Sequence, residues 1–289
     1  MTDRTAISVV LAATEPSPDL ANCLAVLVPQ AEAAGGEVIV GEGYEEEAPG
    51  ARAAGTSERV QWIRVPGASV FELRALGAEA ARGDVIALTE DHCIVGSDWC
   101  AQILDAFKRY PDALAATGPV LNGATDRLID WANFLHTFGA FLPPANTAQR
   151  DRCPPAANVA YRRSALGSGP IAPGWMELEL SPRLFFDGRF CVNDGMTVTH
   201  VQSHGFFGTL AAHFHNGRST TGLHRVPLTR RQLPWTQFRA AVSSISREAR
   251  SAPPVRASFP LMLLLSCCHA AGEVTGIVAG PGRSPAKLR

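Results

Sequence analysis

The segment Asp84-Val85-Ile86-Ala87-Leu88-Thr89-Glu90-Asp91-His92-Cys93 joins an apolar run to three polar side chains. Val85 to Leu88 follow a turn at Gly83 and Asp84, and this pattern is typical of a buried strand. The run stops at Glu90, Asp91 and His92, all of which can bind a metal ion. In an open α/β sheet, ligands bind at the carboxyl ends of the strands. The segment therefore predicts a polar site at one sheet edge, although an ordinary solvated strand end would look the same.

The residues before this segment alternate short apolar runs with helical patterns. We expect strands over 7–13, 37–40 and 60–65, and helices over 20–34 and 70–81. This order indicates a largely parallel, doubly wound α/β sheet. Glu15 and Glu42 also follow predicted strands, and several carboxylates at one sheet edge favour cation or nucleotide binding. No GxGxxG follows the first strand and no GxxxxGK[ST] occurs, which argues against a dinucleotide-binding fold and a P-loop NTPase.

The chain resembles family 2 glycosyltransferases in four segments, taken in order along the sequence. They are the predicted strand 8–11, the segment 37–43, the segment Leu73-Arg74-Ala75-Leu76-Gly77 and the segment 83–92. The resemblance continues through 118–123 and 158–163, ends at 215–219, and covers roughly residues 5 to 225. These enzymes have the GT-A fold and use nucleotide-diphosphate sugars. The resemblance implies an α/β fold of GT-A type: a mostly parallel, doubly wound nucleotide-binding sheet with an acceptor-side α+β extension and C-terminal helices.

The resemblance also implies a domain organisation. Residues 1–225 are expected to form the GT-A domain, with a nucleotide-sugar-binding half at 1–120 and an acceptor-side half at 121–225. Residues 226–289 are expected to form a C-terminal helical extension. A chain of 289 residues is long enough for one large domain with such an appendage.

Glu90-Asp91-His92 stands where the family has its Asp-x-Asp metal motif. The resemblance therefore implies that Glu90 and His92 bind the metal ion, with Asp91 between them at the substrate. Carboxylates suit Mg²⁺ or Mn²⁺, and an imidazole shifts the preference towards Mn²⁺. Three further residues match or adjoin family positions that contact the nucleotide: Glu15, Glu42 and Arg74.

The segment Gly174–Leu184 is the second candidate for chemistry. Glu177 falls at the second position of the acidic pair that the family carries here, and Met176 occupies the first. A carboxylate beside an aromatic residue suits a general base, because desolvation raises its pKa. Glu179 would point away from Glu177 on a helix. A glutamate that only stabilises a helix N-terminus remains an alternative for Glu177.

Four other residues are candidates for the site in the light of the resemblance. Asn158 is expected to contact the donor sugar, Trp175 to contact substrate, and Arg218 to contact the diphosphate through a bidentate pair. The HxxxH spacing at 200–204 lacks the glutamate of a metalloprotease, and Thr197–His200 predicts a strand instead. His200 is expected to complete the metal site or to touch the diphosphate.

The expected function is that of an inverting, hexosyltransferase-like glycosyltransferase. A metal ion at 90–92 would assist departure of the nucleotide diphosphate, and Glu177 would deprotonate an acceptor hydroxyl on a glycan, a lipid-linked molecule or a small molecule. A non-catalytic nucleotide-sugar-binding protein of the same fold is an alternative, because the metal triplet and Met176 depart from the family pattern. A nucleotidyltransferase is a second alternative, although residues 11–16 contain no basic side chain.

Composition limits the partners and the compartment. The net charge of −1 and the pI near 6.7 give no indication of a nucleic-acid partner. Seven scattered cysteines without a CxxC pair favour a reducing cytoplasm over a disulfide framework or a zinc site. The segment 259–280 is strongly apolar but contains His269 and Glu273, so we expect a packed helix or a peripheral contact with the inner membrane face rather than a spanning helix. Pro253-Pro254 is expected to lie in the linker before it.

Overall fold

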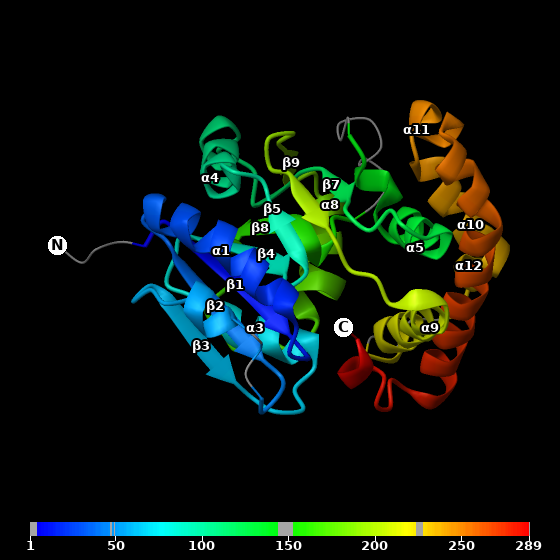
Figure 1. Cartoon of the computed structure of the whole chain (residues 1–289), viewed down its shortest axis with the longest axis horizontal. Coiled ribbons are helices and arrows are strands. Elements are labelled where there is room, and N and C mark those ends of the chain that lie inside the picture. The colour runs from blue at the N-terminus through cyan, green and yellow to red at the C-terminus, as the bar shows by residue number, and fades with distance from the viewer. Residues whose placement is uncertain (1–4, 47, 49, 144–152, 224–227, 289) are drawn as a thin grey trace. The chain divides into compact units, whose positions relative to one another are not determined.

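The structure of the chain is a computed structural model that describes residues 5–46, 48, 50–143, 153–223 and 228–288. The chain forms two compact units (Figure 1). Unit 1 comprises residues 1–120 and 153–200, and unit 2 comprises residues 121–152 and 201–289. This division differs from the expected boundary at residue 225, because residues 201–223 group with the C-terminal helices rather than with the sheet.

Unit 1 is built on a seven-stranded sheet in the order β3-β2-β1-β4-β8-β6-β9. Four neighbouring strands are parallel: β1 (Ile7–Ala13), β2 (Glu37–Glu42), β3 (Val60–Arg64) and β4 (Val85–Glu90). Beyond β4, β8 (Val159–Arg162) is antiparallel to both its neighbours, and β6 (Ala115–Thr117) is parallel to β9 (Phe190–Val192). The predicted α/β class and the predicted mostly parallel sheet are confirmed.

Local sequence signals explain where the helices of unit 1 begin. Ser17 caps α1 with Pro18 in the first turn, and Ser69 forms a capping box with Glu72 at the start of α3. Between and after the strands lie α1 (Pro18–Ala33), α2 (Ala51–Ala54), α3 (Val70–Ala80), α4 (Trp99–Arg109), η3 (Ala156–Asn158), α7 (Arg163–Leu166), η4 (Met176–Leu180) and α8 (Ser181–Phe186). Every residue of β1 is buried, as expected for a central strand covered by helices on both faces.

A short antiparallel pair follows the central strand β4. β5 (Cys93–Val95) pairs with β10 (Val198–His200), so that His200 lies opposite Cys93. The predicted strand at 197–200 is therefore confirmed. β7 (Val120–Asn122) spans the boundary between the two units.

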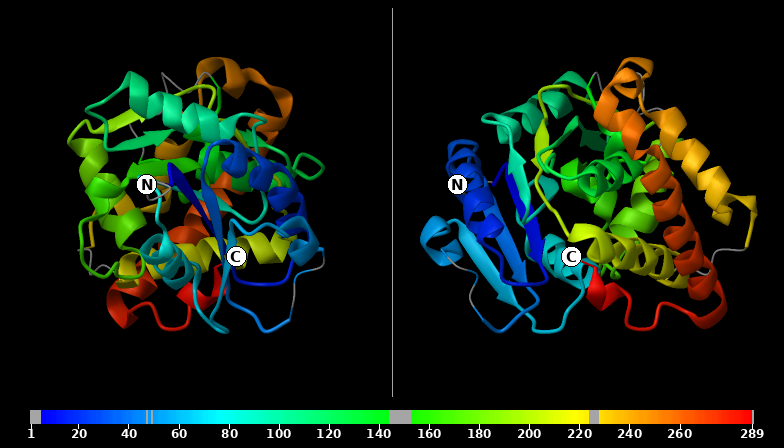
Figure 2. Two further views of the ribbon diagram at one scale, coloured as in Figure 1. Left: turned by 90° about the vertical axis from the view of Figure 1, so that its left-hand side faces the viewer. Right: turned by 45° about the vertical axis from the view of Figure 1, so that its right-hand side comes forward.

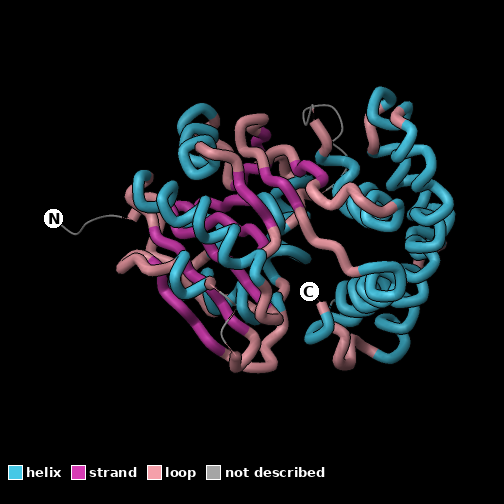
Figure 3. Tube along the Cα trace, viewed as in Figure 1, coloured by secondary structure: helices cyan, strands magenta, loops and turns pink. Residues whose placement is uncertain are grey.

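Unit 2 is helical in its described residues apart from the end of β7 (Figure 3). Its elements are α5 (Leu128–Phe138), η1 (Gly139–Phe141), α9 (Gly205–Leu223), η5 (Arg230–Gln232), α10 (Pro234–Ser244), α11 (Arg247–Ser251), α12 (Pro253–Ala279) and η6 (Pro285–Lys287). Helix α12 packs against α9, α5 and α10. The predicted linker at Pro253-Pro254 is wrong: both prolines form the first turn of α12, where no backbone N–H is needed.

Candidate metal and nucleotide site

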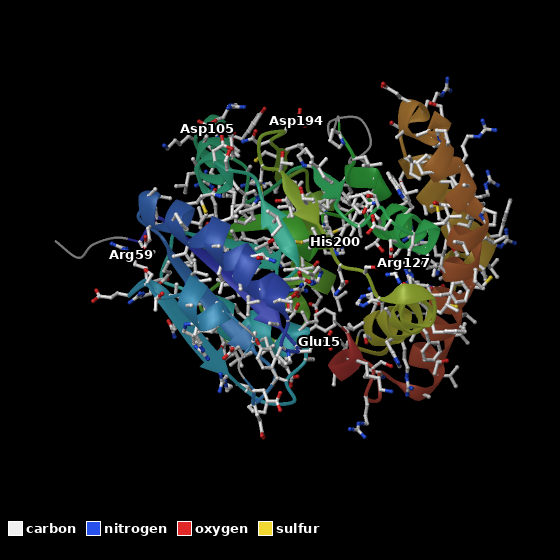
Figure 4. All side chains as sticks on the ribbon, in the orientation of Figure 1. Glu15, Arg59, Asp105, Arg127, Asp194 and His200 are labelled. Atoms are coloured by element: carbon white, nitrogen blue, oxygen red, sulfur yellow. The ribbon has the colours of Figure 1, made fainter. Side chains whose placement is uncertain are left out.

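The parallel strands bring Glu90 to the carboxyl edge of the sheet in unit 1. Glu90 is the last residue of β4 and lies opposite Ala12 of β1. Asp91 and His92 form the turn that leads into β5. The pairing of β5 with β10 then places His200 beside this turn. Figure 4 labels His200 together with Glu15, which follows β1.

Three side chains converge there on one point. The Nε2 atom of His92 lies 3.2 Å from Oε2 of Glu90 and 3.1 Å from Nε2 of His200. The third side of the triangle, from Nε2 of His200 to Oε2 of Glu90, measures 3.6 Å. The structure thus brings together the three residues predicted to bind a metal ion.

This triangle fits a divalent cation. Ligand atoms about 2.1 Å from one ion lie roughly 3.0 to 3.5 Å apart in octahedral or tetrahedral geometry. The hydrogen bond between Nδ1 of His92 and Oδ1 of Asp91, at 2.7 Å, leaves Nε2 of His92 directed at the other two ligands. A carboxylate that holds the second ring nitrogen of a histidine is a common support for metal-binding histidines. Asp91 therefore orients a ligand in this arrangement.

The charges at the triangle also favour a cation. Burial alone would lower the pKa of His92, but hydrogen bonds and negative charge from Asp91 and Glu90 raise the pKa to about 10. Burial would likewise raise the pKa of Glu90, whereas His92 and Arg74 hold that pKa well below its ordinary value. A proton on His92 is one way to supply the positive charge that these carboxylates require, and a divalent ion is another.

The thiol of Cys93 also lies within 4.8 Å of ligand atoms of Glu90 and His92. Its thiol is fully buried, and burial followed by the Glu90 charge raises its pKa well above the ordinary value. Because a thiol binds metal as the thiolate, His200 is the better third ligand. Cys93 is thus a small buried residue at the start of β5.

Arg74 joins the metal triangle to a second carboxylate. Its Nη2 atom lies 2.9 Å from Oε1 of Glu90, and its Nη1 atom lies 3.3 Å from Oε1 of Glu177. The helix that carries Arg74 approaches the sheet closely at Gly77, where an added Cβ would lie 2.4 Å from Val10. Glycine three residues after Arg74 therefore allows the guanidinium to reach the strand ends.

Glu177 lies in η4, a single turn of π-helix of the kind often found at functional sites. Burial raises the pKa of its carboxyl above the usual range, and the positive charge of Arg74 opposes part of this effect. The Oε2 atom of Glu177 is buried and has no hydrogen-bond partner among the described residues. One oxygen is thus held by Arg74, while the other is available to accept a proton. Glu179, two residues on, is exposed.

Glu42, at the end of β2, is fully buried and engaged by two arginines. Its Oε2 atom lies 2.5 Å from Nη2 of Arg52 and 3.1 Å from Arg64. The Arg52 guanidinium stacks on the ring of Trp62, 3.7 Å from its centroid. Sequence reasoning missed both arginines, although Arg64 is the residue opposite Glu42 in the parallel pair of β2 and β3.

The Oε1 atom of Glu42 is buried and forms no hydrogen bond of normal geometry with a described residue. The Tyr44 hydroxyl lies near this carboxylate: burial raises the pKa of Tyr44, and the Glu42 charge and a side-chain interaction with Glu42 add to this effect. A buried acceptor atom without a regular donor suits a ligand that brings an N–H or O–H group. This is compatible with the nucleoside contact expected of Glu42.

Asn158 is held by hydrogen bonds within unit 1, and its expected contact with a donor sugar stays a prediction. Its side chain is fully buried, and its Nδ2 atom donates to the carbonyl oxygens of Pro119 and Met196 at 3.0 and 2.7 Å. Its Oδ1 atom accepts a hydrogen bond from Nε1 of Trp99 at 2.9 Å. These bonds satisfy the amide within the protein, so Asn158 tethers the segment that leads to β10 and His200.

The other expected substrate residues are placed as follows. Trp175 is partly buried and packs against the core cluster of unit 1 that includes Met176 and Leu180. Arg218 belongs to α9 of unit 2, and its Nε atom donates to the carbonyl oxygen of Gly280, just after α12, at 3.0 Å. Positive charge at a helix C-terminus is stabilising. Glu15 is partly buried after β1. Substrate contacts of Glu15, Trp175 and Arg218 stay predictions.

No family model matches the chain, and no curated protein sequence matches it. Among solved structures, the chain is similar to "Mannosyltransferase PcManGT from Pyrobaculum calidifontis in complex with GDP-Man and Mn2+". The identity is 14% and the TM-score 0.58, over 94% of this chain and 88% of that one. At this identity the likeness shows the fold alone: a mixed α/β fold with a large, mostly parallel sheet.

Proposed function

We propose that this protein is an inverting glycosyltransferase that moves a sugar from a nucleotide-diphosphate donor to an acceptor hydroxyl. The observation that carries the proposal is the convergence of Glu90, His92 and His200, joined through Arg74 to Glu177, at the carboxyl edge of the parallel sheet. The fold likeness to a mannosyltransferase solved in complex with GDP-Man and Mn²⁺ supports a donor of this class. A cytoplasmic location, with an acceptor on a glycan, a lipid or a small molecule, belongs to this proposal.

In this proposal, different residues of unit 1 bind the metal ion, the diphosphate and the nucleoside of the donor. Glu90, His92 and His200 would hold Mn²⁺ or Mg²⁺, which supplies positive charge next to the donor diphosphate. Arg74 would contribute a further, permanent positive charge to the departing diphosphate. The buried Oε1 atom of Glu42 would accept a hydrogen bond from the nucleoside, and Asp91 would keep His92 oriented.

Glu177 would act as the base. Its Oε2 atom would take the proton of the acceptor hydroxyl while the hydroxyl oxygen attacks the anomeric carbon. The bond from that carbon to the diphosphate oxygen breaks in the same displacement, and the nucleotide diphosphate leaves. Attack from the face opposite the leaving group inverts the anomeric configuration.

A second candidate is a nucleotide-sugar-binding protein without transfer activity. It is favoured by the ion pair between Arg74 and Glu177, which holds one oxygen of the proposed base. Binding of donor is common to both candidates, whereas turnover distinguishes them.

Donor binding is tested by calorimetric titration with GDP-mannose and UDP-glucose, with and without Mn²⁺. A donor at a hundred times its Kd stabilises the folded protein by about 2.7 kcal/mol, so a thermal shift gives an independent readout. Glu90→Gln should abolish the Mn²⁺-dependent part of binding, and the exposed Glu58→Gln serves as the matched control. Absence of any donor binding would refute both candidates, and Mn²⁺-dependent donor binding without transfer to any hydroxyl acceptor would favour the second.

A further inference from the structure

Helix α12 exposes a face with no polar side chain. The exposed residues follow one another at intervals of four, three, four, three and four: Pro260, Leu264, Cys267, Ala271, Val274 and Val278. This spacing places them along one side of the helix over about 27 Å. The outward face of a helix in a water-soluble protein is normally charged or polar. Leu264 is 37% exposed and Val278 is 81% exposed, so the apolar surface is available for contact.

The opposite face of α12 packs against other helices of unit 2. Gly272 lies against the backbone of Phe214 in α9, and Ser266 accepts or donates a hydrogen bond with His136 of α5 at 3.0 Å. Glu273 accepts a hydrogen bond from Gln237 of α10. By length and composition alone α12 could cross a membrane. In the described residues, α12 packs on α9, α5 and α10 along one side and is exposed along the other.

Positive charge and a tryptophan flank the outer face of α12. Helix α10 lies beside α12, as Figure 2 also shows, and its exposed side carries Trp235 and, one turn on, Arg239. Arg230 and Arg231 are exposed just before α10, and Arg256 is exposed in the first turn of α12. Residues 226–289 contain nine arginine and lysine side chains but only two carboxylates, although the whole chain carries a net charge of −1.

We propose that unit 2 binds the surface of a membrane that contains anionic lipid, with the outer face of α12 in the interfacial layer. Apolar residues would enter the boundary between headgroups and acyl chains, Trp235 would lie at headgroup depth, and the flanking arginines would contact lipid phosphates. The arginines favour this partner over a second copy of the chain, because copies joined through this face would bring like charges together. The proposal concerns unit 2 and is independent of the activity proposed for unit 1.

Flotation with lipid vesicles tests the proposal on the full chain. Wild-type protein should bind phosphatidylcholine vesicles that contain phosphatidylglycerol more strongly than pure phosphatidylcholine vesicles, and high salt should weaken the difference. Val274→Asp with Val278→Asp should reduce binding by about tenfold for each valine removed from the lipid. Arg230→Gln and Arg231→Gln should each reduce binding to the anionic vesicles about fivefold.

The matched control is Phe186→Asp, which changes an equally exposed apolar side chain, 81% accessible, in unit 1. It should leave vesicle binding unchanged. Circular dichroism and thermal unfolding show that each variant is folded. Equal binding by the α12 variants and wild type would overturn the proposal. A second result would also overturn it: light scattering shows a dimer that the α12 variants dissociate, and neither wild type nor any variant binds vesicles.

Discussion

The Nη1 atom of Arg74 lies 3.3 Å from Oε1 of Glu177, while Nη2 of the same guanidinium lies 2.9 Å from Oε1 of Glu90. Arg74 is buried and separates two carboxylates that would otherwise face each other in a poorly solvated site. Burial alone would lower the pKa of Arg74, and the charges of Glu177 and Glu90 raise it, so the guanidinium stays charged. One side chain therefore links the proposed metal site to the proposed base.

Replacing Arg74 should cost both stability and donor binding. Arg74→Met leaves Glu90 and Glu177 without their cation, and breaking a buried ion pair typically costs about 3 to 5 kcal/mol. Arg74→Lys should restore part of the loss, because one ammonium cannot match the two-pronged geometry of a guanidinium. Urea unfolding measures the change, with the exposed Arg189→Met as control. If Arg74→Met were as stable as the control, the bridge would have no energetic role.

Glu177→Gln should lower kcat by about 10²- to 10⁴-fold with little change in the Kd of the donor, because a base contributes only in the transition state. Glu177 accepts a proton only when ionised, and burial raises its pKa. Activity should therefore fall as the pH drops through this raised pKa, at a higher pH than for an exposed glutamate. Steady-state rates across pH measure the effect. The exposed Glu179→Gln variant should keep wild-type rates. Loss of activity in that variant alone would identify Glu179, rather than Glu177, as the base.

His200→Ala should weaken Mn²⁺ binding by removing one corner of the ligand triangle. The nitrogen of His200 lies 3.1 Å from that of His92, so both imidazoles would bind the same ion. Titration calorimetry with Mn²⁺ alone measures the affinity without reference to activity. His215→Ala, in α9 of unit 2, is the control. Unchanged Mn²⁺ affinity in His200→Ala would restrict the metal site to Glu90 and His92.

The strand ends could be predicted from the sequence because they depend on local patterns. The apolar run before Glu90 and the run before Glu42 are buried strands, and parallel pairing puts both carboxylates at one edge. The strand that ends at His200 could also be predicted. Its place beside His92 was expected only from the family resemblance, since local patterns do not reveal the pairing between β5 and β10 across about a hundred residues.

The partners of the charged residues were beyond sequence reasoning for the same reason. Arg74 and Glu177 are 103 residues apart and meet only because η4 packs beside the sheet edge. Asn158 has a side chain of the type that contacts ligands, yet its amide group forms three hydrogen bonds within the protein. A polar residue near a site is either a ligand contact or a tether for the loops that build the site. Only the tertiary hydrogen bonds distinguish the two.

Glu273 should make the stability of unit 2 depend on pH. Burial raises its pKa to about 7, and the hydrogen bond from Gln237 opposes this only in part. The folded state thus binds the proton more tightly than the unfolded chain. The protonated Glu273 therefore stabilises the folded state fully below the ordinary pKa of about 4.3, and this stabilisation is lost as the pH rises to about 7. Glu273→Gln should therefore gain Tm relative to wild type between pH 4.5 and 7, measured without lipid.

The exposed Glu248→Gln in α11 is the control for Glu273→Gln and should track wild type at every pH. A difference in Tm between Glu273→Gln and wild type that stays constant from pH 4 to pH 8 would mean that Glu273 does not titrate in this range. A difference of opposite sign would mean that Glu273 is stabilised as the carboxylate, for which His269, with Nε2 at 3.8 Å from Oε1, is the nearest candidate cation.

Gly272→Ala is the sharpest test of the contact between α9 and α12. Helix propensity alone predicts that alanine stabilises the interior of a helix by about 1 kcal/mol relative to glycine. Packing predicts the opposite, because a Cβ at Gly272 would lie 2.0 Å from the carbonyl oxygen of Phe214 and 2.9 Å from the backbone nitrogen of Arg218. Both contacts are with backbone atoms that cannot rotate away, so the helices must separate. Overpacking of this kind costs about 1 to 3 kcal/mol, and we expect a net loss of stability in urea unfolding.

Gly169→Ala, where the new Cβ meets nothing within 4 Å, is the control and should change stability little. A stabilised Gly272→Ala would show that α12 does not pack on α9 at this distance, and would remove the reason for holding α12 in unit 2 with one face exposed.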